Sequence, residues 1–262
     1  MDTLRALAIL QPQVEKGLDK VQRWTNFQKS SGSRSQTTLA HSVSIQLAAI
    51  AVITAEQRHN PEPFDAGFVH QALALHDLGE LCRAEIGFDV VHLQKTTGSD
   101  LKEVETARNL FLSLPSPLRD QCMFLFLSQF ASKEKMLDGQ EKDMMDQLRA
   151  EKSLECLIFN AIERVDYILY AYSEYLLHGN VRIMIHVLRN QHAKLKALAE
   201  QLPGFAKEIY KPDMIAWADK LLAEYEDVEE NEIPNRKEGA MRKAQTDLPF
   251  NQTDEQRAAS SE

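Results

Sequence analysis

The sequence predicts an all-α protein, and two observations carry this prediction: a helix-favouring composition and apolar residues that recur every three or four positions. Of the 262 residues, 44% are apolar, whereas Gly and Pro number only 10 and 9. Ala, Leu, Glu, Lys and Gln, which favour helices, are abundant. Apolar steps of three and four residues place side chains on one helical face. A chain of this length can bury a sizeable core in one large domain or two small ones.

The N-terminal part contains two expected helices separated by a loop. The first helix is expected over residues 3–24, although Pro12 could break it into two pieces. The polar stretch 29–38 is rich in Ser and Thr and contains Gly, which is typical of a loop. The second helix is expected over 39–58. Its apolar face is formed by five residues, Val43, Leu47, Ile50, Ala51 and Thr54.

The middle and C-terminal parts continue the helical pattern. Asp65 is expected to cap the N-terminus of a helix that runs to His76-Asp77. Residues 81–98 show no clear period. Further helices are expected over 100–113, 117–131, 141–178, 181–201 and 206–226. The long helix over 141–178 should stop near Gly179, because Gly tolerates the backbone conformation that ends helices.

From Glu229 onward the apolar pattern ends. Residues 229–262 are rich in Glu, Asn, Gln, Lys and Ser, a composition that cannot bury enough apolar surface to order itself. We therefore predict one helical domain over residues 1–228 and a polar tail over 229–262 that is disordered or loosely attached.

Charge and cysteine content restrict the function classes. The formal net charge is −9, which disfavours binding to a nucleic acid polymer. Three widely spaced cysteines, Cys82, Cys122 and Cys156, disfavour a disulfide framework and favour a reducing compartment. The N-terminus lacks the apolar region of a secretory signal, and no apolar run approaches the roughly 20 residues that span a bilayer. We expect a cytoplasmic protein without membrane contact.

Four ionisable residues stand out in apolar surroundings: His41 at the start of an apolar helix, His76-Asp77 at the end of the next, and Asp166 inside a distant one. A helical wheel places Asp166 beside the apolar stripe of its helix, where a carboxylate requires a positive partner. Two imidazoles and two carboxylates suit Mn, Fe, Co or Zn, and the imidazoles favour these metals over Mg. Taken singly, a His-Asp pair arises by chance, and Asp166 could simply pair with Arg164.

The order His41, His76-Asp77, Asp166 resembles the signature of the HD-domain superfamily of helical, metal-dependent phosphohydrolases. The chain is most similar to the 5′-deoxynucleotidase branch. That branch has an Arg-Trp near the end of its first helix, a loop Arg seven residues before the first metal His, and His-Asp-x-x-Glu. The corresponding residues here are Arg23-Trp24, Arg34 and His76-Asp77-x-x-Glu80.

The resemblance implies an all-α HD-domain bundle in which His41, His76, Asp77 and Asp166 bind a divalent metal. It implies that Glu80 acts with Asp77 in catalysis, as a general acid or base or by positioning water. The simpler interpretation of Glu80 is a solvated residue near a helix end.

The branch motifs also suggest how substrate would be held. Arg34 and Arg23 would hold the substrate phosphate, because a guanidinium makes two-point contacts with phosphate. Trp24 would stack on the substrate or wall the pocket. The simpler interpretations are a surface charge for Arg23 and core packing for Trp24.

Departures from the branch pattern gather around the substrate pocket. An acidic residue usually precedes the first His, where this chain has Ala40. A Gly-Asp pair usually follows the Glu, where this chain has Ala84-Glu85. The predicted function is removal of the 5′-phosphate from nucleoside or deoxynucleoside monophosphates, with a small-molecule nucleotide as partner and a homodimer as implied assembly. Two alternatives stay open: a nucleoside triphosphate triphosphohydrolase, and a non-catalytic nucleotide-binding module with a vestigial site.

Overall fold

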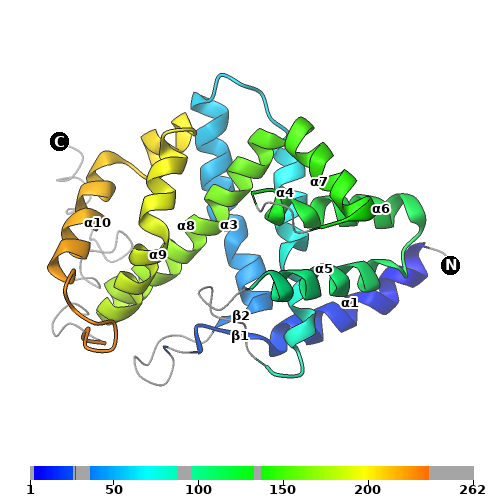
Figure 1. The fold of residues 1–262 in the computed structure, drawn as a ribbon, viewed down its shortest axis with the longest axis horizontal. Coiled ribbons are helices and arrows are strands. Elements are labelled where there is room, and N and C mark those ends of the chain that lie inside the picture. Colours follow the sequence, from blue (N-terminus) through cyan, green and yellow to red (C-terminus); the bar gives the residue numbers. More distant parts are fainter. Residues whose placement is uncertain (1–2, 26, 28–35, 88–95, 133–136, 236–262) are drawn as a thin grey trace, which may run out of the picture. The chain divides into compact units, whose positions relative to one another are not determined.

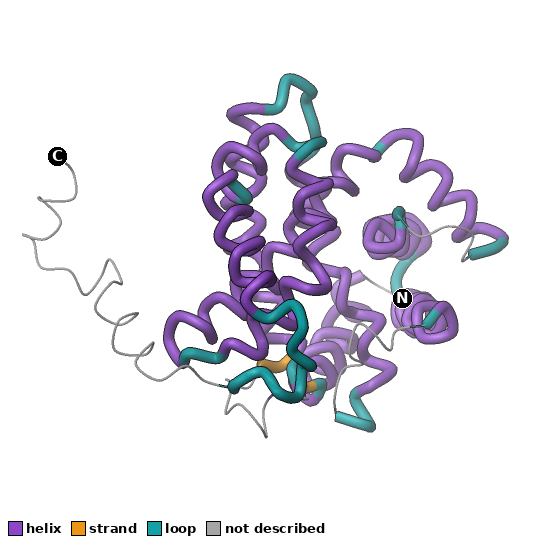
Figure 2. Tube along the Cα trace, turned by 60° about the vertical axis from the view of Figure 1, so that its left-hand side comes forward, coloured by secondary structure: helices purple, strands orange, loops and turns teal. Residues whose placement is uncertain are grey.

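The computed structural model describes residues 3–25, 27, 36–87, 96–132 and 137–235. Helices make up most of this part, which confirms the all-α prediction (Figure 2). A single antiparallel strand pair among the described residues joins Gln22 to Thr37 and Arg23 to Gln36, and the sequence analysis did not predict it.

The described residues divide into two compact units. Unit 1 takes in the described residues of Met1–Thr25, Ser35–Glu163 and Leu198–Ile209. Unit 2 takes in those of Asn26–Arg34, Arg164–Ala197 and Tyr210–Glu262.

Unit 1 carries most of the helices, which can be followed in Figure 1. The elements in chain order are α1 (Thr3–Lys20), β1 (Gln22–Arg23), β2 (Gln36–Thr37), α3 (Thr38–His59), α4 (Ala66–Leu75), the 3₁₀ helix η1 (His76–Arg83), α5 (Thr97–Phe111), α6 (Ser116–Leu127), the 3₁₀ helix η3 (Ser128–Phe130), α7 (Gly139–Glu151), the first part of α8 (Ser153–His178) and the π-helix η4 (Phe205–Ile209). Within this unit α3 contacts α1, α4 and η4, while η1 contacts α5.

Unit 2 contains the rest of α8, α9 (Val181–Ala199) and α10 (Pro212–Glu224). Side chains link these helices: Arg164 donates a hydrogen bond to Gln191, and Trp217 packs edge-on against Tyr172. Helix α8 ends at His178, and Gly179 follows with a φ of +66°, so the predicted stop is confirmed.

The expected helix over 141–178 is instead two helices, which is a correction to the sequence analysis. The break falls at Lys152, whose φ of −130° and ψ of 28° lie outside the helical range. Neither Gly nor Pro marks this position. The break is held by a tertiary contact, because the Glu155 carboxylate in the first turn of α8 accepts a hydrogen bond from the Asp65 backbone N–H at 3.0 Å. No local sequence pattern encodes that contact.

The predicted apolar face of α3 is also wrong as a buried face. Val43, Leu47 and Ile50 are 68%, 72% and 56% exposed. The opposite face is buried instead, through Ile45, Ala48, Ala49, Val52 and Ile53. Apolar residues surround the whole helix, so periodicity could not choose a face. Close packing chooses it, because a Cβ at Gly204 would lie only 2.3 Å from the backbone of Ala55.

Helix α3 is also long and apolar enough to cross a membrane by length and composition, with a mean hydropathy of 1.6 over 18 residues. No apolar run of membrane-spanning length was expected from the sequence. Core helices of globular proteins meet the same criterion, and 44% of this window is buried. The observation is therefore weak evidence for a membrane.

The start of the predicted tail is attached to unit 2. Ile233 is buried, and the Glu230 carboxylate accepts a hydrogen bond from His186 at 2.9 Å. Residues 236–262, where most of the predicted disorder falls, lie outside the described residues. The division into a domain over 1–228 and a tail over 229–262 stays a prediction.

Candidate metal centre

His41 is positioned by the N-terminus of α3. The hydroxyl of Thr37 caps this helix by accepting a hydrogen bond from the backbone N–H of Ala40 at 3.1 Å. The helix therefore begins just before His41, and the imidazole projects from its first turn. His41 is 1% exposed, although histidine is usually found at intermediate depth.

His76 and Asp77 are positioned by a change of helix type. Helix α4 runs from Ala66 to Leu75. Asp65 caps its N-terminus, as the sequence predicted, by accepting a hydrogen bond from the Phe68 N–H. The 3₁₀ helix η1 then starts at His76. Gly79 allows α5 to approach η1, because a Cβ there would lie 2.7 Å from the Cβ of Glu103. This close approach explains why a Gly follows the His-Asp pair.

The three side chains converge on one point. His41 Nε2 lies 3.3 Å from His76 Nε2 and 3.4 Å from Asp77 Oδ2, and His76 Nε2 lies 3.2 Å from Asp77 Oδ1. One ligand atom from each residue falls within 4.8 Å of the others, and all three residues are buried. The sequence-predicted ligands of unit 1 are thus brought together.

A hydrogen bond at Nδ1 sets the tautomer of His76. His76 Nδ1 lies 2.7 Å from the carbonyl oxygen of Leu73, which can only accept a hydrogen bond. Nδ1 therefore donates this hydrogen bond, and in the neutral imidazole Nε2 keeps its lone pair. A backbone carbonyl that orients a ligand imidazole in this way is typical of metal sites.

The donor set fits a first-row divalent metal. Bonds of about 2.1 Å to a shared ion place neighbouring donor atoms about 3.0 to 3.4 Å apart, depending on coordination geometry. The observed separations of 3.2 to 3.4 Å agree. In addition, the buried Asp77 Oδ2 makes no hydrogen bond within the described residues, as expected of an oxygen that serves another partner.

Arg23 lies on the short strand pair beside the cluster, and Trp24 follows it directly in the chain. Arg23 is 4% exposed, and its Nη1 lies 3.8 Å from Asp77 Oδ2, so the surface-charge interpretation of Arg23 is wrong. Trp24 is half-buried, and its indole N–H donates a hydrogen bond to Gln36 Oε1 at 3.1 Å. Trp24 has a φ of +61°. This backbone conformation is strained for a bulky residue, and strained conformations of this kind cluster at functional sites.

Glu80 has a different orientation from the one the sequence suggested. An α-helix would align Glu80 with His76, whereas the 3₁₀ helix aligns residues three apart, namely Asp77, Glu80 and Arg83. Glu80 is 2% exposed, so it is not a solvated residue. Its Oε2 accepts a hydrogen bond from Thr38 Oγ1 at 2.8 Å, and its Oε1 lies 3.6 Å from Arg83 Nη1. Arg83 also pairs with the buried Glu103.

Two predicted site residues lie outside the part of unit 1 that forms the cluster. Asp166 is buried on α8 and belongs to unit 2, so its role as a ligand stays a prediction. Arg34 lies outside the described residues.

Sequence reasoning missed several neighbours of the cluster. Gln129 Nε2 donates a hydrogen bond to the His76 carbonyl oxygen at 2.6 Å, and the Phe159 ring packs edge-on against His76 with centroids 5.9 Å apart. Thr38 and Arg83 could have been found from the sequence, because Thr38 lies three residues before His41 and Arg83 lies three residues after Glu80. Gln129, Phe159 and Glu103 carried none, because tertiary packing alone brings them here.

No family model matches the chain, and no curated protein matches it significantly.

Proposed function

We propose that the protein is a metal-dependent phosphohydrolase that removes the 5′-phosphate of nucleoside or deoxynucleoside monophosphates. One observation carries the proposal: two buried imidazoles and a buried carboxylate converge within ligand distance of one point. The HD-domain resemblance supplies the reaction class. It also supplies Asp166 as the proposed fourth ligand and Arg34 as a proposed phosphate contact.

The residues of the proposed site have different roles in the reaction. His41, His76 and Asp77 would hold a divalent cation, with Mn, Co, Fe or Zn favoured over Mg by the imidazole donors. Such a cation supplies Lewis-acid stabilisation of a phosphoryl group and lowers the pKa of water. Arg23, 3.8 Å from Asp77, contributes a positive charge where phosphoryl oxygens would gather.

Glu80 is the proposed proton acceptor. Thr38 and Arg83 fix its carboxylate in one orientation, which favours a defined position for the attacking water. In the reaction the water oxygen bonds to phosphorus, the phosphorus–alkoxide bond breaks, and the alkoxide leaves with a proton. The products are orthophosphate and a nucleoside.

The test is phosphate release from a panel of nucleoside mono- and triphosphates by EDTA-treated protein, with Mn, Co, Zn or Mg restored one at a time. Orthophosphate from monophosphates supports the proposal. Release of triphosphate from nucleoside triphosphates would replace it with the triphosphohydrolase alternative.

A binding module with a vestigial site is the second candidate function. One observation favours it: the Glu80 carboxylate is fully engaged by Thr38 and Arg83, as in a structural ion pair. Nucleotide binding without turnover under every metal would support this candidate and overturn the hydrolase.

A further inference from the structure

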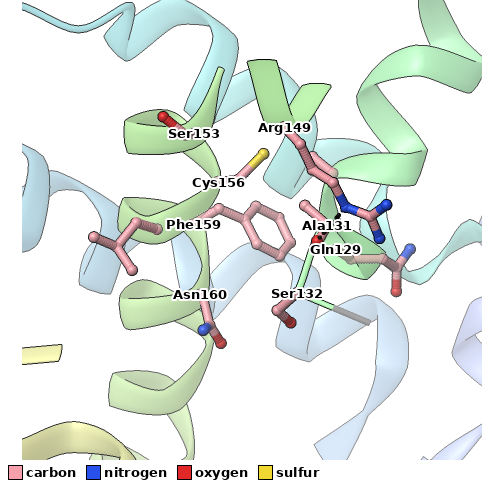
Figure 3. Close-up of a pocket in the computed structure, with 10 residues that line it drawn as sticks. Gln129, Ala131, Ser132, Arg149, Ser153, Cys156, Phe159 and Asn160 are labelled. Carbon is pink, nitrogen blue, oxygen red and sulfur yellow. Dashed lines mark hydrogen bonds between the residues drawn. The ribbon is translucent and has the colours of Figure 1, made fainter. Parts of the chain in front are cut away.

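A cavity of about 180 Å³ lies in unit 1 beside the metal centre. It is formed between the first turns of α8 and the segment 128–132 that follows α6, with Arg149 from the end of α7 on its far side (Figure 3). The Phe159 ring projects from α8 into this space, and Asn160 and Ser132 lie at the same end of it in Figure 3.

Two of the cavity's residues also contact His76. Phe159 lines the cavity and packs its ring edge-on against the His76 ring, with centroids 5.9 Å apart. Gln129 lines the cavity and donates a hydrogen bond to the His76 carbonyl oxygen at 2.6 Å. The cavity therefore adjoins the metal centre through two residues that contact both, Phe159 and Gln129.

The lining of the cavity suits an uncharged group. Arg149 is its single charged residue among the described ones, and its guanidinium donates to the Ala131 carbonyl oxygen and lies 3.4 Å from Asp146 Oδ1. Cys156 lines the cavity, and burial raises the pKa of its thiol to about 12, so the thiol stays neutral at physiological pH. A phosphate would therefore meet little positive charge here, whereas a neutral heterocycle would not be penalised.

Several polar side chains of the cavity can form hydrogen bonds with a planar ligand. Asn160, Ser132 and Ser153 line the cavity and make no side-chain hydrogen bond with any residue that the structure describes. Gln129 uses its amide N–H₂ for the carbonyls of His76 and Phe126, which leaves its Oε1 as an acceptor. Amide and hydroxyl groups pair with the donor and acceptor edge of a nucleobase, and the Phe159 ring offers an aromatic contact.

The size of the cavity selects one ring system. A 150 Å³ cavity in another protein holds benzene, so about 180 Å³ accommodates a single heterocycle but not a whole nucleotide. The phosphorus of a nucleoside 5′-phosphate and its glycosidic nitrogen are six bonds apart, which span about 7 Å when extended. A base in contact with Phe159 would lie at most about 10 Å from the His76 ring, since ring contact adds up to about 4 Å to the 5.9 Å separation.

We propose that this cavity is the nucleobase subsite, in which Asn160 and Gln129 hydrogen-bond the base and Phe159 packs against it. The inference rests on the proposed function, because it assigns the phosphate end of the same substrate to the metal centre.

The test compares two substrates and two variants. Asn160→Leu keeps the side-chain size and removes the hydrogen-bonding amide, while Asn109→Leu makes the same change at an exposed position of α5 outside the cavity. Asn160→Leu should raise KM for nucleoside monophosphates by about 10- to 100-fold with little change in kcat. For ribose 5-phosphate, which lacks a base, KM should not change. Asn109→Leu should match the wild type with both substrates.

Two outcomes would overturn the inference in an active enzyme. One is an unchanged KM for nucleotides in Asn160→Leu. The other is an equal loss of activity towards ribose 5-phosphate, because that loss would mean that Asn160 supports the fold or the metal centre.

A protein that hydrolyses neither substrate would refute the proposed function and leave the cavity to a binding test. Deoxynucleosides would then be titrated into wild-type protein and Asn160→Leu by calorimetry. Binding that the variant loses supports the subsite, and no binding at millimolar concentrations overturns it.

Discussion

Two regions of this molecule place a buried histidine beside an aspartate, with different results. In unit 1, Nε2 of His41 and Nε2 of His76 face Asp77 at 3.4 and 3.2 Å. In unit 2, His192 Nε2 donates to Asp219 Oδ1 at 2.7 Å, and its Nδ1 accepts from the Tyr210 hydroxyl at 2.5 Å. The first arrangement gathers electron-pair donors around one point, whereas the second is a linear chain of donors and acceptors.

The comparison shows what separates a metal site from a structural hydrogen-bond chain. Both nitrogens of His192 are used by protein groups, so no lone pair is left for a ligand. His76 Nδ1 donates to a backbone carbonyl, whereas its Nε2 faces the donor atoms of His41 and Asp77 at 3.3 and 3.2 Å. A His–Asp contact is therefore not evidence of a metal site, and the direction of the unused lone pairs decides.

The largest expected effect comes from removing the carboxylate of the metal centre. Asp77→Asn should lower metal-restored phosphate release by about 1,000-fold or more, because the variant loses an anionic ligand. Asp219→Asn, the matched change in unit 2, should keep full activity. Both are measured by orthophosphate release after EDTA treatment and metal addition. Full activity in Asp77→Asn would refute the metal assignment.

The next effect concerns stability beside the metal centre. Arg83→Met should lower the free energy of unfolding by about 3 kcal/mol, because it leaves the buried Glu80 and Glu103 without their shared cation. Lys142→Met removes an exposed pair with Asp146 and should change stability little. Urea denaturation at pH 7 measures both variants. Equal free energies of unfolding for the two variants would show that the buried ion pairs contribute no net stability.

Metal binding itself should separate the two histidine clusters. A metal that binds only the folded state at 100 times its Kd stabilises that state by about 2.7 kcal/mol. Adding Mn or Co to EDTA-treated protein should therefore raise Tm, and His76→Ala should abolish the rise. His192→Ala should lower Tm but keep the metal-dependent increase. Loss of the increase in His192→Ala would contradict the division between a metal site and a structural chain.

The smallest effect is expected from Tyr210→Phe, which removes one hydrogen bond of the chain and should cost about 1 kcal/mol at pH 7. Burial and, secondarily, the Asp219 charge raise the pKa of Tyr210 above its usual value of 10.0. Above pH 10 the unfolded tyrosine loses its proton while the folded one keeps it, so stability falls as pH rises. Tyr210→Phe should flatten this fall. Denaturation midpoints between pH 9 and 11 test the slope, and parallel curves would contradict it.

Local sequence patterns determined the helical class and several boundaries. Asp65 as a helix cap and Gly179 as a helix stop were predictable, because a cap and a left-handed residue depend on a few neighbouring backbone groups. The choice of His41, His76 and Asp77 was predictable for a related reason. An ionisable side chain in an apolar helix needs a compensating partner, and the sequence shows both the residue and its setting.

Only the tertiary structure decided how those residues are used. The break at Lys152, the buried face of α3 and the 3₁₀ turn that directs Glu80 towards Arg83 depend on packing between segments far apart in the chain. The cavity beside Phe159 arises in the same way, since the segment 128–132, α7 and α8 each contribute part of its wall. Periodicity fixes which residues share a face of one helix, but the face that is buried follows from what packs against it.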